Sequence, residues 1–487
     1  MGSTTEDWQT IAAAHRSKQL EAIPDTWRLN EEALTKLRGD STPDAGRLIK
    51  LQAARVSGIM SEDELHITEA YTATQLLEMM AHGKLTALEV TIAFSKCAAI
   101  AQQLTSCLTE IFFNEGVERA KWLDQFYQDY GRVVGPLHGL PVSPKDSFVV
   151  PGHHATVGYV EFLRRPVPET SSVLVNMLLD AGAVLYCKTN VPQTMMTADS
   201  ENNVFGRTLH PHNTQLTAGG SSIGEGALLA FSGCVLGVGT DIAGSIRIPS
   251  LCCGTFGFKP TTGVGPVAGP MANCVEDLAL FMKTVIGQLP WKLDPSVAHI
   301  PWRTTHTKNS DKLVIGLLPE DEIFKLHPPV RRALQRACSA LQDMGHTVVQ
   351  LPSDASRSVA LGASIAFQYF GMGAGRPTYS NLACQARDSM RHGGTLQSRP
   401  HDTYGNPVYT LMWNVLDYPA ATMPFGASSR DEDSEFVETE ALFDANYEPE
   451  ALDGMPCAIQ VIAPRFQDEE CLNALRIIDR DLKSCQV

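Results

Sequence analysis

Two serines lie in two glycine-rich segments of the chain, 24 positions apart. Ser221 belongs to the segment 218–226 and Ser245 to the segment 237–249. Glycine loses more conformational entropy on folding than any other residue, so its density here indicates unusual backbone angles or close approach to another group. In a flexible linker, the aliphatic residues of both segments would be exposed to water. We therefore expect a binding or catalytic site.

A phosphate site and a hydrolase elbow are two interpretations that the sequence does not favour. The phosphate-loop pattern G-x-x-x-x-G-K-[ST] is absent, and neither segment contains the third glycine of the dinucleotide fingerprint. The run from Gly220 to Gly224 matches G-x-S-x-G, which would make Ser222 a nucleophile placed just after a buried strand. The preceding residues, 210–217, are polar and interrupted by Pro211, so they do not form such a strand.

A third interpretation, a serine nucleophile activated by a lysine base, accounts for both glycine-rich segments. A serine hydroxyl attacks an amide only when a base takes its proton, and Lys145 ends a short apolar run that begins at Leu140. Together with the surrounding sequence, these residues resemble the amidase signature family over 58–296 and, more loosely, over 405–480. The N-terminal residues Trp8 and 23–27 look like those of acetamidase-type general amidases. The blocks that carry the resemblance are 138–145, 188–193, 218–226, 237–249, 258–261, 269–272 and 416–420.

The resemblance implies a role for each residue of the two segments. Ser245 matches the family's nucleophile, Ser221 its bridging serine and Lys145 the base behind it. In the family the bridging serine follows a cis peptide, and Gly220 provides the least crowded residue there. The residues whose backbone N–H groups are expected to bind the oxyanion are Ile242, Ala243, Gly244 and Ser245. The residues expected to support the loops are Gly220, Ser222, Asp241 and Arg247, the last two by hydrogen bonding.

Lys145 can act as a base only when its amine is neutral. Its reference pKa is about 10.4, so neutrality near pH 7 requires a fall of about three pH units, or about 4 kcal/mol. Burial in a medium of low dielectric can produce such a fall. We therefore expect a buried Lys145 with hydroxyl neighbours and no close carboxylate; Asp146 would point to the opposite face of the strand. Glu225 is interpreted as an ordinary charge in the first turn of the following helix.

The order of predicted strands and helices around Lys145 and the two serines indicates an α/β fold. Apolar runs of strand length, 140–145 and 182–188, flank a helical segment at 172–181, and the same order recurs at 314–317, 328–344 and 348–351. This alternation is typical of βαβ units. We expect a single large domain with a mixed, mostly parallel twisted β-sheet covered by helices, which is the amidase signature fold. Residues 1–60 would form an N-terminal arm packed on the main domain 61–487, with a catalytic core at about 135–265.

Composition excludes several other classes of protein. The chain has 487 residues, 44% hydrophobic and 19% charged, with a net charge of −15, which fits neither a disordered chain nor a nucleic-acid binder. No metal-ligand spacing, signal peptide or membrane-spanning run occurs, and the cysteines are irregularly spaced. We expect a cytoplasmic enzyme without cofactor or metal that acts on a small-molecule amide, and a homodimer from the resemblance.

Four departures from the family pattern leave three hypotheses open. Ile223 and Ala243 replace usual glycines, Pro144 replaces an aliphatic residue, and the chain is short between Thr262 and Gly269 and around 367–404. The first hypothesis is an amidase that releases ammonia or an amine through an acyl-enzyme, as a tailoring step in a natural-product pathway. The second is a catalytically impaired amidase-like protein with shortened pocket segments. The third is an amidotransferase A-type subunit.

Overall fold

The computed structural model describes residues 7–38, 44–199, 201–264, 268–305, 312–354, 358–369, 407–434 and 447–485. Its α-helices are α1 (Trp8–Glu21), α2 (Glu31–Arg38), α3 (Ala53–Val56), α4 (Glu62–Ala70), α5 (Ala73–Ala81), α6 (Ala87–Thr105), α7 (Phe113–Tyr130), α8 (Val173–Asp180), α9 (Ile223–Ala230), α10 (Arg247–Cys253), α11 (Val275–Gly287), α12 (Pro328–Asp343), α13 (Val359–Tyr369), α15 (Val408–Val415), α16 (Pro449–Leu452) and α17 (Asp468–Ser484). Its strands are β1 (Leu108–Ile111), β2 (Pro141–Pro144), β3 (Val184–Leu185), β4 (Cys187–Thr189), β5 (Glu201–Asn202), β6 (Gly206–Arg207), β7 (Leu236–Gly239), β8 (Phe256–Lys259), β9 (Gly269–Ala272), β10 (Val314–Leu317), β11 (Thr347–Gln350), β12 (Ala420–Ala427) and β13 (Pro456–Ile462).

A mixed sheet forms the centre of the fold. Within the described residues it has seven strands in the order β13-β12-β8-β9-β7-β2-β3. Strands β7, β2 and β3 pair in parallel, whereas β7 and β9, β9 and β8, β8 and β12, and β12 and β13 pair antiparallel. Parallel pairing is therefore confined to the part of the sheet that leads into Lys145. The fold class is the predicted α/β class.

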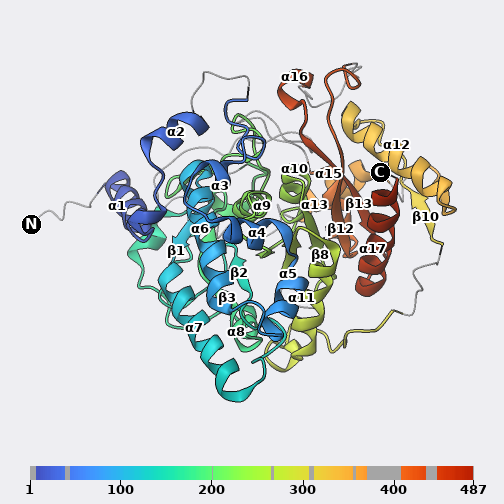
Figure 1. Cartoon of the computed structure of the whole chain (residues 1–487). Helices are drawn as coiled ribbons and strands as arrows, with labels where there is room; N and C mark the ends of the chain where they lie inside the picture. The colour runs from blue at the N-terminus through green and yellow to red at the C-terminus, as the bar shows by residue number, and fades with distance from the viewer. Residues whose placement is uncertain are drawn as a thin grey trace, which may run out of the picture.

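Helices cover this sheet, and local sequence signals explain where they begin and end. Helix α6 begins after Thr86, whose hydroxyl accepts the N–H of Glu89 while the Glu89 carboxylate accepts the N–H of Thr86. This reciprocal capping box follows Gly83, which has a φ of +65°. These residues separate α5 from α6. Figure 1 shows α6 and α7 on the N-terminal side of the molecule, and α12, β10 and α17 on the opposite side.

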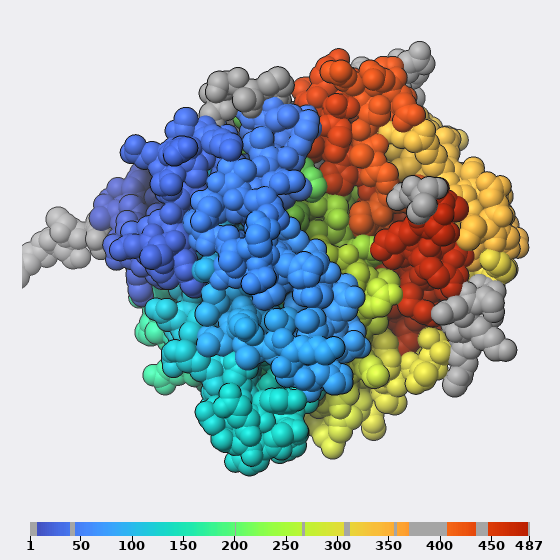
Figure 2. Space-filling view, viewed as in Figure 1, coloured from blue at the N-terminus to red at the C-terminus, as the bar shows by residue number. Residues whose placement is uncertain are grey.

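The N-terminal residues pack on the rest of the chain through α1. The Gln19 side chain accepts the N–H of Ile111 at 2.7 Å and donates to Glu110 at 3.1 Å. His15 Nε2 lies 2.8 Å from the same Glu110 carboxylate. Figure 2 shows the surface of the N-terminal segment continuous with that of the helices that follow it. The division of the chain into an arm and a main domain stays a prediction.

Candidate active site

Lys145 follows β2 directly and points into the protein beside two hydroxyl groups. Its Nζ lies 2.7 Å from Ser221 Oγ and donates to Thr240 Oγ1 at 2.9 Å. The Lys145 side chain is fully buried. The backbone fixes its place, because its N–H donates to the carbonyl of Val238 on β7 at 3.0 Å. The strand thus holds the amine of Lys145 against the first glycine-rich segment.

The surroundings of Lys145 favour the neutral amine. Burial lowers the pKa of Lys145 to about 7, although the carboxyl groups of Asp241 and Glu225 act to raise it. Within the described ranges, no carboxylate oxygen lies within 4 Å of its Nζ. Asp146 is held on another side by Thr109 Oγ1 at 2.9 Å and by the N–H of Val157 at 2.7 Å. The lysine can therefore accept a proton near neutral pH.

The two glycine-rich segments meet through their backbones. The peptide bond between Gly220 and Ser221 is cis. The N–H of Ser222 donates to the carbonyl of Ser245 at 3.0 Å, which places the residue after Ser221 against Ser245. Ser221 is almost completely buried and Ser245 is 8% exposed. The geometry brings a lysine amine, a buried hydroxyl and a partly accessible hydroxyl to one place.

The loop before Ser245 offers backbone N–H groups, but fewer than the sequence suggested. Within the described residues, the N–H groups of Ile242, Ala243 and Ser245 donate to no protein acceptor, and the Ser245 hydroxyl makes no hydrogen bond. The N–H of Gly244 instead donates to Asp241 Oδ1 at 2.8 Å. The expectation that all four N–H groups are available for an oxyanion is corrected for Gly244, because a buried carboxylate already accepts its hydrogen.

Asp241 and Arg247 hold this loop from behind. Arg247 Nε and Nη2 donate to the two Asp241 carboxylate oxygens at 3.0 and 2.9 Å, and both side chains are buried. Asp241 also accepts the N–H of Ile246 at 3.2 Å and the side-chain amide of Asn414 at 3.0 Å. Burial opposes ionisation of Asp241, but Arg247 and the hydrogen bonds outweigh it and hold the pKa of Asp241 well below its usual value. The pair fixes the curvature of the loop.

Four further residues surround the site and were not predicted from the sequence. Thr240 contacts Lys145 as described above, and Thr410 Oγ1 donates to the carbonyl of Ala243 at 2.6 Å. Asn414 and Gln460 accept hydrogen bonds from Arg247 at 2.6 and 2.8 Å. The proximity of Thr240 to Ser245 was a usable signal. The other three lie more than 160 positions beyond the loop, so no local pattern connects them to it.

Neither the burial of the Glu225 carboxyl group nor the packing of Ile223 was predicted from the sequence. Glu225 stands in the first turn of α9 but is fully buried, and burial raises its pKa to about 8, an effect that its hydrogen-bonded contacts with Ser143 and Thr189 oppose. The interpretation as an ordinary helix-end charge was wrong, because the carboxyl group faces the sheet. Ile223, which replaces a usual glycine of the family pattern, is buried in an apolar cluster with Ala218 and Ile248.

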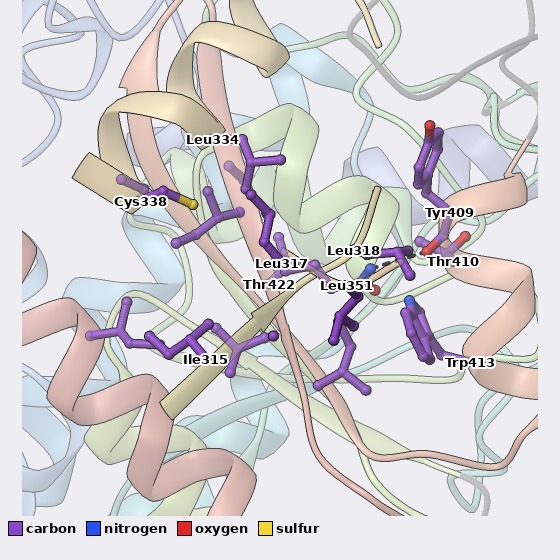
Figure 3. A pocket seen from close by; sticks show the side chains of 18 of the residues that line it. Ile315, Leu317, Leu318, Leu334, Cys338, Leu351, Tyr409, Thr410, Trp413 and Thr422 are labelled. Atoms are coloured by element: carbon purple, nitrogen blue, oxygen red, sulfur yellow. Dashed lines mark hydrogen bonds between the residues drawn. The ribbon is translucent and has the colours of Figure 1, made fainter. Parts of the chain in front are cut away.

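An apolar cavity of about 760 Å³ adjoins the loop supports. Figure 3 shows its aliphatic wall, contributed by β10 and α12, with Tyr409, Thr410 and Trp413 of α15 at one side. Arg247 and Thr410 belong both to this wall and to the support of the Ser245 loop. Of the two segments that are short compared with the family pattern, residues 265–267 and 370–404 lie outside the described residues.

The described residues provide neither a metal-binding cluster nor a membrane-spanning helix. They contain no group of three or more His, Cys, Asp or Glu side chains arranged to hold a metal ion. No described helix is long and apolar enough to cross a membrane. All the cysteines in the described part of the chain are free thiols.

Comparisons with known proteins find similar sequences and a similar fold. Residues 89–374 match the family model described as Amidase. An "Amidase" of Gibberella moniliformis is 36% identical over 542 aligned residues, covering 98% of this chain and 99% of the relative. An "Acetamidase" of Emericella nidulans is 35% identical and covers 96% and 97%. A solved structure titled "Fatty acid amide hydrolase" superposes with a TM-score of 0.87 at 27% identity, covering 98% of this chain and 95% of the other. The 542-residue alignment exceeds the length of this chain, so the relative carries residues that this chain lacks.

Proposed function

The chain belongs to the amidase family and is a hydrolase of carboxamide C–N bonds, and from this premise we propose that Ser245, Ser221 and Lys145 carry the reaction. Ser245 Oγ attacks the amide carbonyl carbon while its proton passes through the Ser221 hydroxyl to Lys145 Nζ. The C–N bond then breaks, the leaving nitrogen takes that proton back along the same path, and ammonia or an amine departs. Water hydrolyses the resulting ester on Ser245 and releases the carboxylic acid.

A single observation carries this proposal: the buried Lys145 amine lies 2.7 Å from Ser221 Oγ, and burial lowers its pKa to about 7. A general base is most effective when its pKa lies near the working pH. The free N–H groups of Ile242, Ala243 and Ser245 support the proposal, because each could donate to the oxyanion. Removing one such donor typically lowers kcat by about 10²–10³-fold. Gly220, Ser222, Asp241 and Arg247 are proposed to position the loops.

We propose further that the apolar cavity receives an apolar part of the substrate. It adjoins the Ser245 loop through Thr410 and Arg247, and aliphatic side chains such as Leu317 and Leu334 form its wall. Burial of each methylene group contributes about 0.8 kcal/mol. In a series of linear amides, kcat/KM should therefore rise with acyl length. Leu334→Trp, which narrows the cavity, should shift the preference toward short amides.

The proposed chemistry is tested by hydrolysis of a panel of linear amides, with mass spectrometry of the quenched enzyme. The wild-type protein should carry an acyl group on the peptide that contains Ser245. Ser245→Ala should lose both the acyl group and turnover, whereas Ser222→Ala should still be acylated on Ser245. Acylation on Ser222 would favour the elbow interpretation, and a folded wild-type protein that is never acylated would favour the impaired relative.

Three further expectations, on the oligomeric state, the partner subunits and the pathway, complete the proposal. A homodimer is tested by light scattering of the purified protein. The amidotransferase alternative predicts co-purification with partner subunits from the native host. A tailoring role in a natural-product pathway predicts that a deletion strain accumulates an amide whose corresponding acid is found in the parent strain.

A further inference from the structure

Glu225 is a buried carboxyl group that the proposed reaction does not use. It lies in the first turn of the helix that follows Ser221, and its side chain lies between β2 and β4. Its Oε2 lies 2.6 Å from Ser143 Oγ, and its Oε1 accepts the Thr189 hydroxyl at 2.7 Å. Gly237 on β7 makes room for it, since a Cβ at that position would lie 2.2 Å from Glu225 Oε2.

The contacts beyond Glu225 form a series of hydrogen bonds, and each contact holds one hydrogen atom. Glu225 Oε2 is 2.6 Å from Ser143 Oγ, Ser143 Oγ is 3.0 Å from Cys234 Sγ, and Cys234 Sγ is 3.0 Å from the carbonyl of Leu236. Three successive contacts that end on a carbonyl need three hydrogens. The Ser143 hydroxyl and the Cys234 thiol supply two of them. The third is supplied if Glu225 is protonated and its hydroxyl donates to Ser143.

The charges around Glu225 agree with a neutral acid. The ionisable groups that face it are Lys145 just after β2, Cys187 of β4, Cys107, Cys234 and Tyr186. Burial raises the pKa of each of these thiols and of the phenol, so they stay neutral. Lys145 also faces Asp241. Within the described part of the chain, no Lys or Arg nitrogen lies within 4 Å of the Glu225 carboxyl.

Glu225 connects the strand that leads into Lys145 with the helix that follows Ser221, and these are the two residues proposed to pass the proton. Ser143 and Lys145 are two residues apart, so their side chains leave the strand on the same face. Ser221 precedes α9, and Glu225 lies in the first turn of that helix. The Glu225–Ser143 contact therefore ties the element that carries Lys145 to the element that carries Ser221.

We propose that Glu225 is a positioning residue of the amidase reaction: as a neutral carboxylic acid it fastens the Lys145 strand to the Ser221 loop without placing an anion beside the base. This role rests on the proposed function. An ionised Glu225 would stabilise the ammonium form of Lys145 and leave less of the free amine to take a proton. The neutral acid provides the same contacts without this effect.

The test compares Glu225→Gln with Glu225→Ala. Glutamine can donate to Ser143 and accept from Thr189 as the neutral acid does, so Glu225→Gln should keep kcat/KM within about threefold and leave the acid limb of its pH profile in place. Glu225→Ala removes the connection and should lower kcat/KM by about 100-fold, as expected when reacting groups are misplaced by about 1 Å. Thermal unfolding verifies that both variants are folded.

Three outcomes would overturn the proposal. The first is wild-type kinetics in both variants. The second is a large loss in Glu225→Gln similar to that of Glu225→Ala. The third is an acid limb in Glu225→Gln displaced to lower pH by about one unit, which would show that the wild-type carboxyl is ionised and acts as a counter-ion for Lys145.

Infrared spectroscopy tests the protonation state without relying on activity. At pH 6.5 the wild-type protein should show a protonated-carboxyl band that is absent from Glu225→Gln and that declines as the pH rises through about 8. If neither Glu225 variant folds, Ser143→Ala takes their place and should shift this band. A change in the carboxylate bands alone would overturn the proposal. Failure of the wild-type protein to hydrolyse any amide would refute the proposed function while leaving the infrared assignment intact.

Discussion

Removing the Thr240 hydroxyl should lower the pH at which Lys145 starts to act as a base. Thr240 Oγ1 accepts a hydrogen bond from Lys145 Nζ at 2.9 Å. Such a bond contributes about 1.5–3 kcal/mol when the donor is charged and about 0.5–1.5 kcal/mol when it is neutral. Thr240→Val therefore destabilises the ammonium form by about 1 kcal/mol more than the amine. At 1.36 kcal/mol per pH unit, the pKa of Lys145 should fall by about 0.7.

The assay is the pH dependence of kcat/KM for an amide substrate. In the wild-type enzyme the acid limb should lie near the Lys145 pKa of about 7. In Thr240→Val the limb should move to lower pH, with a smaller change in the plateau. Thr240→Ser keeps the hydroxyl and is the matched control, which should retain the wild-type limb. An acid limb in Thr240→Val at or above the wild-type position would refute the reasoning.

Asp241→Asn should lower the free energy of unfolding by about 3–5 kcal/mol, because it leaves the buried Arg247 guanidinium without its carboxylate. Urea denaturation at pH 7 measures this change in stability. A loss below about 1 kcal/mol would contradict the prediction. Because the pKa of Asp241 is depressed, its contribution to stability is complete above pH ~4 and is lost only as the pH falls through the lowered value, so the two proteins should converge in strong acid. Gly244→Ala should lower kcat/KM by about 100-fold, since the added methyl group would lie 2.3 Å from Thr410 Oγ1 at a φ of +124°. Gly152→Ala has a comparable positive φ of +80° but open space around it, and equal effects of the two substitutions would disprove the steric explanation.

The sequence predicted the elements of the fold better than their pairing. The runs at 140–145 and 314–317 became β2 and β10, because strand length and apolar content are local properties. Pairing depends on partners far along the chain. Strand β12 pairs antiparallel with both β8 and β13, and no βαβ pattern connects these strands.

The same difference applies to the site: residues in local motifs were predicted, whereas contacts between distant parts of the chain were not. Lys145 and the two serines were recognisable because each lies in a motif with a characteristic spacing. Glu225 was misjudged because its position in a first helical turn is local, whereas its burial depends on Gly237 of a neighbouring strand. The loss of the Gly244 N–H to Asp241 was equally hidden, since only the folded curve of the loop brings that donor and acceptor together.

The most direct test of the account measures how fast a fluorophosphonate probe labels Ser245 as a function of pH. If a neutral Lys145 is the base, the labelling rate of the wild-type protein should rise through a midpoint near pH 7. Lys145→Ala should react about 10²–10⁴-fold more slowly and lack that midpoint. A folded Lys145→Ala protein that is labelled at the wild-type rate, with the same pH dependence, would contradict the central claim.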